Sequence, residues 1–276
     1  MLPKADLHTH TFYSDGALSP VELIDKAKQN GITVLSITDH DSINGITEAV
    51  NYAKSVGIEI IPGVEISTDV EDKEIHLLGY FIDIENVNLK NYLSFFRIER
   101  LNRAKRIIEK LNYLGVKITL DDVVKKAQLS SIGRPHIANA LVDLGVVSNF
   151  YEAFEKYLRD NGPAYEKKNH LSAFSAIKLI SDAGGLTVLA HPGFVNESIL
   201  TSLIKSGIDG IEVIHPSHNE SQVKFYRGIV NSFFMLQTGG SDFHGGHKND
   251  EQNMGKFYIS PKLVDTMRKL VYKHSA

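Results

Sequence analysis

Short apolar runs rich in β-branched residues alternate along the chain with longer segments of helical periodicity. Seven of these runs predict strands, at residues 4–9, 32–38, 58–66, 74–82, 186–190, 209–214 and 233–238. The segment Ser19-Pro20-Val21-Glu22 offers a capping serine, a proline at the first helical position and a glutamate that completes a capping box. This signature predicts a helix over residues 19–30.

The alternation of strand and helix favours an α/β fold with a mainly parallel sheet. Seven such strands can close into a barrel or form an open, doubly wound sheet. No glycine-rich loop follows the first strand, which argues against nucleotide binding of the Rossmann type.

One region interrupts this alternation, because residues 89–168 show helical periodicity and no convincing strand. An apolar stripe runs from Leu93 to Leu114, and shorter helices are expected at 120–127, 135–144 and 149–159. We therefore expect a barrel formed by residues 1–88 and 169–276, with residues 89–168 inserted as a helical cap subdomain.

The predicted cap carries a local excess of positive charge. Residues 97–126 hold nine basic and four acidic side chains, a balance of +5, whereas the whole chain has a net charge of −3. A solvated helix face accounts for this pattern, and so does a cap that attracts a polyanionic substrate. The sequence leaves both interpretations open.

The composition of the 276 residues restricts the possible chemistry. The chain has no cysteine, which excludes disulfides, thiolate zinc sites and cysteine nucleophiles. Any metal must therefore bind to nitrogen and oxygen ligands. The first ten residues lack the apolar run of a signal peptide, and no stretch is long enough to span a membrane, so we expect a cytoplasmic protein without a membrane partner.

Histidines and acids gather at or near the predicted strand ends. Parallel α/β barrels bring these ends to one mouth, where so many polar groups need compensating charge. Nine ligands exceed the needs of one ion and fit two or three divalent ions bridged by a carboxylate, for which Glu65 is the candidate. The nine are His8, His10, Asp15, His40, Glu65, His76, His191, Asp242 and His244.

The motifs HxH, SDG, TDH, GxE, a strand histidine, HPG and DxH follow one another in this order. Their order resembles the PHP (polymerase and histidinol phosphatase) family over the whole chain. The resemblance implies a distorted (β/α)7 barrel that binds two or three ions, with manganese expected first and iron or zinc as alternatives. It further implies one ion on His8, His10, Glu65 and Asp242, a second on Glu65, His76 and His191, and a third on Asp15, His40 and His244.

The stretches IGRPHIANALVDLG and IEVIHPSH are similar to a PHP subgroup with a helical cap. That subgroup includes nucleoside 3′,5′-bisphosphate phosphatases and a 5′-3′ exoribonuclease. Arg134, at a predicted helix start, can offer a planar fork to phosphate, and it can equally anchor the cap. His136 and His218 are further candidates for substrate binding, and the role of His215 is left open.

The expected reaction is hydrolysis of a phosphate ester by a metal-bridging hydroxide, held by His8, His10, Glu65 and Asp242. Expected substrates are nucleoside 3′,5′-bisphosphates, 5′-nucleotides or the end of a short 5′-phosphorylated RNA, and no obligate protein partner is evident. A histidinol-phosphate phosphatase is the nearest alternative. An amidohydrolase and a non-catalytic PHP binding module are the others.

Overall fold

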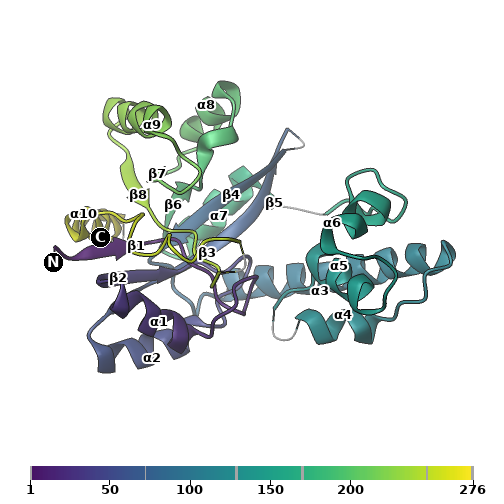
Figure 1. Ribbon diagram of the computed structural model, residues 1–276. Coiled ribbons are helices and arrows are strands. Elements are labelled where there is room, and N and C mark those ends of the chain that lie inside the picture. Colours follow the sequence, from purple (N-terminus) through teal and green to yellow (C-terminus); the bar gives the residue numbers. More distant parts are fainter. Residues whose placement is uncertain (1, 72, 128–129, 169–170, 247, 275–276) are drawn as a thin grey trace. The chain divides into compact units, whose positions relative to one another are not determined.

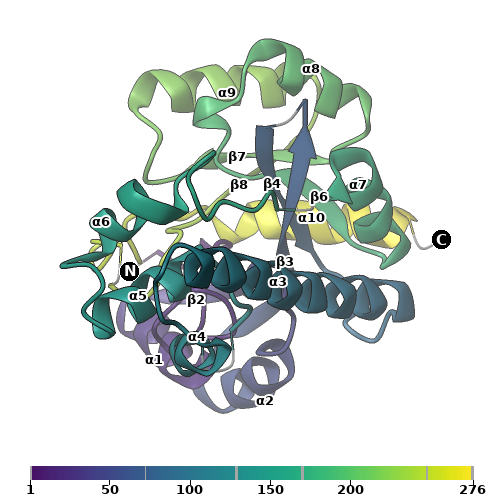
Figure 2. The ribbon, with the colours of Figure 1, turned by 90° about the vertical axis from the view of Figure 1, so that its right-hand side faces the viewer.

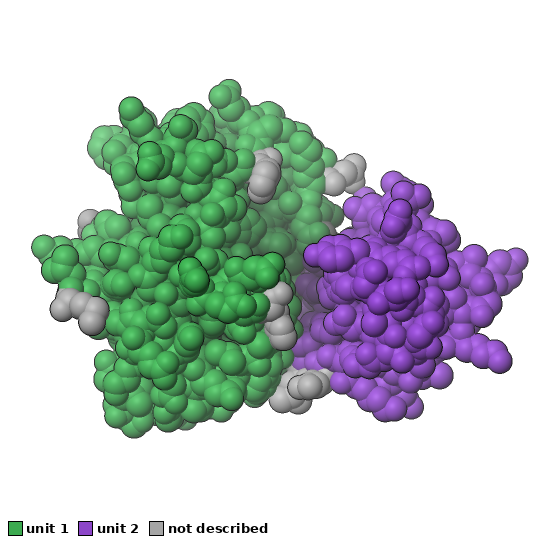
Figure 3. All heavy atoms as spheres, viewed as in Figure 1, with its two compact units in different colours: residues 1–90, 170–276 green, residues 91–169 purple. Residues whose placement is uncertain are grey.

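The computed structural model describes residues 2–71, 73–127, 130–168, 171–246 and 248–274. The chain divides into two compact units (Figure 3). Unit 1 comprises residues 1–90 and 170–276, and unit 2 comprises residues 91–169.

Every strand predicted from the sequence is present in unit 1. Along the sheet the order is β1-β2-β3-β4-β6-β7-β8, and the two-residue strand β5 (Leu171–Ser172) pairs with β3 beside this path. The seven strands of the path are β1 (Lys4–Asp6), β2 (Ile32–Ile37), β3 (Glu59–Val70), β4 (Lys73–Tyr80), β6 (Leu186–Leu189), β7 (Gly210–Ile214) and β8 (Leu236–Gly239).

Backbone hydrogen bonds join the two ends of this path just beyond the regular strands. The amide of Leu7 donates to the carbonyl of Gly239 (3.2 Å), and the amide of Asp242 donates to the carbonyl of His8 (2.9 Å). At Gly240 an added Cβ would lie 2.4 Å from the His8 nitrogen, so only glycine allows this close approach. The result is the distorted seven-stranded barrel expected from the sequence.

The direction of β4 was not predicted. β4 is antiparallel to both of its neighbours, β3 and β6, whereas the other neighbouring pairs on the path are parallel. The start of β4 therefore lies at the edge where the parallel strands end, and His76 is paired with Ser67 there. This reversal explains how a histidine near the beginning of a strand reaches the same edge as ligands that follow other strands.

Helices pack around the strands of unit 1 (Figures 1 and 2). In both views α1 and α2 lie on one side of the strands and α8 and α9 on the other. The predicted capping box is present, because the Glu22 amide donates to Ser19 Oγ (3.2 Å) and the Ser19 amide donates to Glu22 Oε2 (2.8 Å). The helices are α1 (Pro20–Gln29), α2 (Ile46–Val56), α7 (Ala173–Asp182), α8 (Glu197–Lys205), α9 (Glu220–Ser232) and α10 (Pro261–His274).

Helices are the regular secondary structure of unit 2 among its described residues, and the unit has its own apolar core, which includes Ile107, Leu111, Val123 and Leu141. Among the described residues of the whole chain, no helix has both the length and the apolar character needed to span a bilayer. The helices are α3 (Val87–Tyr113), whose first residues belong to unit 1, α4 (Leu120–Ala127), α5 (Arg134–Asp143), α6 (Phe150–Ala153) and a π-helical turn (Phe154–Leu158).

Candidate metal centre

The carboxylate of Glu65 lies at the centre of a ring of histidines in unit 1. Its side chain is 1% exposed, and Oε1 is 2.9 Å from His76 Nδ1 and 3.1 Å from His191 Nε2. Oε2 faces three further ring nitrogens, at 3.2 Å from His8, 3.3 Å from His10 and 3.2 Å from His40. The two oxygens thus address different histidines, which is the geometry that a bridging carboxylate needs.

Asp242 faces the same histidines from the loop that follows β8. Its Oδ1 is 3.1 Å from His10 Nε2 and 3.4 Å from His8 Nε2, and its Oδ2 is 3.3 Å from His215 Nε2. Asp242 and His191 both have positive φ angles, 49° and 29°. Non-glycine residues rarely adopt this region, and residues that do so tend to cluster at functional sites.

A second group of histidines surrounds the carboxylate of Asp15. Its Oδ1 lies 3.3 Å from His244 Nε2, 3.8 Å from His10 Nδ1 and 3.9 Å from His40 Nε2. These four residues form a group whose donor atoms all lie within 4.8 Å of one another. The structure therefore brings together all nine residues selected from the sequence, with Glu65 and Asp15 at two neighbouring centres.

Several donor atoms in these groups are buried and, although oxygen or nitrogen atoms of the neighbouring ligands lie close to them, they form no hydrogen bond of acceptable geometry among the described residues. Buried polar atoms without partners are costly, and divalent cations are a ligand type that satisfies nitrogen and carboxylate oxygen together. The atoms are His10 Nε2, Asp15 Oδ1, His40 Nδ1, His76 Nδ1 and His215 Nε2. The donor set therefore fits metal ions.

The electrostatics keep the carboxylates charged but divide the histidines. Burial alone would raise the pKa of Glu65, but the surrounding imidazoles, His40 first, hold it well below its usual value. The Asp242 carboxyl follows the same pattern, with His8 as the main cause of its lowered pKa. Burial lowers the pKa of His40 to about 3, which keeps its ring neutral. Although burial opposes it, the Glu65 carboxylate raises the pKa of His76 to about 9, and Glu212 and Glu65 raise that of His8 well above its usual value, so metal ions binding there would displace protons. Charged carboxylates and neutral imidazoles are the forms that bind metal.

Comparison with known proteins agrees with this geometry. Residues 6–105 match the model of the PHP domain. A 5′-3′ exoribonuclease of Haemophilus influenzae is 36% identical over 88% of this chain and 91% of its own. A 3′,5′-nucleoside bisphosphate phosphatase of Chromobacterium violaceum is 33% identical over 88% of each chain. The chain belongs to the PHP family.

Solved structures show the same fold. A protein of Bifidobacterium adolescentis described as a metal-dependent phosphoesterase superposes with a TM-score of 0.83 at 32% identity, over 96% of this chain and 95% of its own. A Chromobacterium violaceum protein described as an amidohydrolase, with sulfate and no metal bound, gives a TM-score of 0.77 at 32% identity over 89% of each chain. This PHP chain thus shares its fold with a protein described as a metal-dependent phosphoesterase.

Sequence reasoning missed Glu212, which supports this PHP centre from β7. Glu212 is fully buried, its Oε1 is 2.9 Å from His8 Nδ1, and its Oε2 accepts the His191 amide at 2.7 Å. A carboxylate on Nδ1 fixes the tautomer of His8 so that Nε2 faces Glu65 and Asp242. The only sequence signal was an acid inside the apolar run Ile211-Glu212-Val213.

Glu212→Gln should weaken metal binding without removing a ligand. Glutamine can donate to His8 Nδ1 and so favour the wrong tautomer, and loss of such an orienting partner typically lowers metal affinity or activity about 10- to 100-fold. Metal titration and kcat/KM would be measured beside Glu220→Gln, which alters an exposed glutamate at the start of α9. Equal metal affinity in both variants would refute the orienting role.

The other acids near His40 have structural roles. Asp39 accepts the Thr11 amide (2.7 Å), the Thr11 hydroxyl (2.6 Å) and the Ser14 hydroxyl (2.5 Å). Asp41 accepts the Ser67 amide at 3.1 Å. Both acids thus hold in place the segments that carry the candidate metal ligands. His40, which lies between them in the sequence, contacts Glu65.

The proposed substrate residues are distributed over both units. In unit 2, Arg134 donates from Nη1 to the Leu158 carbonyl (3.0 Å) and to Asp160 (2.6 Å), while His136 Nδ1 accepts the Gly133 amide (3.0 Å). These contacts tie the start of α5 to the π-helical turn and cap α5.

The two histidines of the IHPSH segment lie in unit 1. His218 donates from Nδ1 to the Val213 carbonyl (3.0 Å), and its ring is 5.6 Å from that of His215. His215, whose role the sequence left open, is the one that contacts Asp242.

Proposed function

We propose that this PHP protein hydrolyses phosphate esters of nucleotides: nucleoside 3′,5′-bisphosphates, 5′-nucleotides or the 5′-phosphorylated ends of short RNA. The observation that carries the proposal is the group of donors around Glu65, whose two oxygens face different histidines. Such an arrangement suits two adjacent divalent ions acting on one phosphate. The nucleotide preference rests on the names of the two relatives reported above.

The nine donors and Glu65 as the bridge are our proposed ligand set, with manganese as the first candidate and iron or zinc as alternatives. Divalent ions bound there would lower the pKa of a coordinated water and offset charge on the phosphate. Asp242 is 27% exposed at its side chain against 1% for Glu65. We therefore propose that Asp242, with His8 and His10 beside it, orients the attacking water. Glu65 is proposed to fix the distance between the ligands at its Oε1 and those at its Oε2.

Arg134 is proposed to bind a substrate phosphate, with His136 and His218 as additional phosphate contacts. Both of the hydrogen bonds of Arg134 described above come from Nη1, so Nε and Nη2 can form a fork with two phosphate oxygens. A position at the N-terminus of α5 adds the favourable end of the helix dipole.

Arg134→Ala should therefore raise KM about 10-fold or more, since a charge-assisted bidentate contact is worth about 1.5–3 kcal/mol, while the bound metal stays unchanged. Asp160→Asn is the matched control, because it breaks the ion pair of Arg134 but keeps the guanidinium. KM and metal content would be measured for both variants. An equal rise in KM for the two would return Arg134 to a purely structural role.

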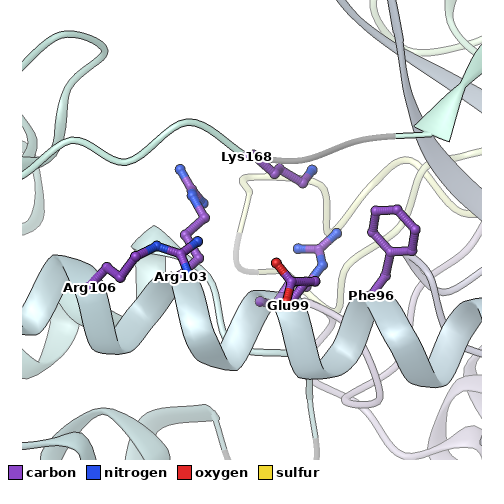
Figure 4. A pocket seen from close by; sticks show the side chains of 6 residues that line it. Phe96, Glu99, Arg103, Arg106 and Lys168 are labelled. Carbon is purple, nitrogen blue, oxygen red and sulfur yellow. The ribbon is translucent and has the colours of Figure 1, made fainter.

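Unit 2 also offers a basic pocket along α3 (Figure 4). Phe96, Glu99, Arg103 and Arg106 project from one side of the helix, and Lys168 lies on the segment that passes over them. We propose that this pocket attracts the polyanionic part of longer substrates. The positive charge of residues 97–126 would then serve substrate binding and would not be only that of a solvated helix face.

Lys168→Gln should raise KM for a 5′-phosphorylated oligonucleotide about threefold to tenfold at low salt, and the difference should shrink as salt increases. Lys117→Gln removes an exposed charge of the same unit outside the pocket and serves as the control. Identical salt profiles for both variants would indicate that the pocket does not contact substrate.

The deciding experiment compares turnover of a nucleoside 3′,5′-bisphosphate, histidinol phosphate and a short 5′-phosphorylated RNA in the presence of manganese, with products resolved by chromatography. Release of the 3′-phosphate or of mononucleotides supports the proposal. Preference for histidinol phosphate would identify a histidinol-phosphate phosphatase in place of a nucleotide phosphatase. Turnover only on a parallel panel of amides and lactones would favour an amidohydrolase, and no turnover with metal bound would favour a binding module.

A further inference from the structure

Lys248 lies directly against the Asp15 group. Its ammonium donates to Asp15 Oδ2 at 2.9 Å and to His244 Nε2 at 2.8 Å. Both partners belong to the four-residue group His10, Asp15, His40 and His244. A cation carried by the chain itself thus contacts two of the three ligands, Asp15 and His244, of the third proposed metal position.

The tautomer of His244 makes this contact specific. Its Nδ1 is 2.7 Å from the Asp242 carbonyl, and because a carbonyl can only accept, Nδ1 carries the proton. When the ring is neutral, its lone pair is therefore on Nε2, the atom that faces Lys248. Lys248 uses the same lone pair that a metal ion would use.

The loop that carries Lys248 is built to hold it there. The buried carboxylate of Asp250 accepts the amides of both His244 and Gly246, the latter at 2.7 Å. Gly245 and Gly246 have φ angles of +83° and +96°, which permit the tight turn. The side chain of Lys248 remains 52% exposed, so it can leave the site without disturbing a core.

Charge also distinguishes this position from its neighbour. The donors around Asp15 include one carboxylate and three histidines. The neighbouring donors include Glu65 and Asp242, and Glu212 stands behind His8. A divalent ion at the Asp15 group therefore gains less from carboxylates and meets the positive charge of Lys248.

We propose that Lys248 is a tethered cation that competes with the third metal ion for Asp15 and His244. The protein then holds two ions tightly at the Glu65 group, and a third binds only by displacing the ammonium. Lys248 thus sets the metal concentration at which the three-ion form appears. This inference rests on the metal centre of the proposed function.

The test is a titration of metal-depleted protein with Mn²⁺, in which free Mn²⁺ is measured by electron paramagnetic resonance. Lys248→Met should bind the third ion at least tenfold more tightly than the wild type, with the first two ions unchanged. Lys248→Arg retains the charge and should bind the third ion weakly, like the wild type. Lys256→Met removes a positive charge that lies over the Phe257 ring, and it controls for net charge.

An unchanged or weaker third-ion constant in Lys248→Met would overturn the inference, as would equal tightening in Lys256→Met. Turnover of phosphate esters by the wild type with two ions bound would leave the proposed function intact in those cases. A wild type that binds no Mn²⁺ at all would instead refute the metal centre itself, and the inference with it.

Discussion

Glu65→Gln is expected to reduce phosphoesterase turnover by at least about a thousandfold, because losing several kcal/mol of metal-derived transition-state stabilisation has that effect on rate. The amide keeps the shape of the side chain but replaces one oxygen with an NH₂ group that cannot bind metal. Two histidine nitrogens face Oε1 and three face Oε2. Whichever oxygen the NH₂ group replaces, the nitrogens that faced it then meet a hydrogen-bond donor instead of a carboxylate oxygen. The two neighbouring groups can then no longer share one carboxylate.

The measurement pairs kcat with metal content by mass spectrometry, for Glu65→Gln and for Glu48→Gln, which changes an exposed glutamate of α2. We expect at least one ion fewer in the first variant and wild-type values in the second. Circular dichroism would confirm that both variants fold. Wild-type turnover in folded Glu65→Gln would eliminate the bridging role and the mechanism built on it.

The sequence predicts the strands and most of the site because both follow from local pattern. Apolar runs bounded by turn residues locate strands, and ligands such as His8, His10 and His191 stand at strand ends where a barrel must gather them. Such a run does not show the direction of β4 relative to its neighbours, since apolar and polar residues alternate in the same way whichever direction the strand runs. The sequence could therefore suggest that His76 lies beside Glu65, but it could not explain why. The explanation is the antiparallel pairing of β4 with β3.

Other features escaped because they depend on contacts between residues far apart in sequence. An acid within a strand is usually directed to solvent, so Glu212 gave little sign that it contacts His8, which is 204 positions away. Lys248 similarly resembles an ordinary loop lysine until the turn made by Asp250 brings it to Asp15, 233 positions away. Local pattern thus identifies direct ligands, whereas the groups that orient ligands or compete for them require the folded barrel.

Removal of metal is expected to abolish turnover and to lower the thermal midpoint of unit 1. Ions that bind only the folded state stabilise it by linkage, by about 2.7 kcal/mol for each ion at a free concentration 100 times its dissociation constant. Without them, Glu65 and the donor atoms that lack partners remain buried together. Manganese should restore both the activity and the midpoint.

Scanning calorimetry before chelation, after chelation and after addition of Mn²⁺ would measure this effect, with Glu65→Gln as the control. In that variant Mn²⁺ should shift the midpoint much less, because the shared ligand is gone. A shift of equal size in both proteins would mean that Mn²⁺ stabilises the fold elsewhere. An identical midpoint with and without metal in the wild type would show that the histidines and carboxylates around Glu65 satisfy one another, and that the fold does not depend on the ions.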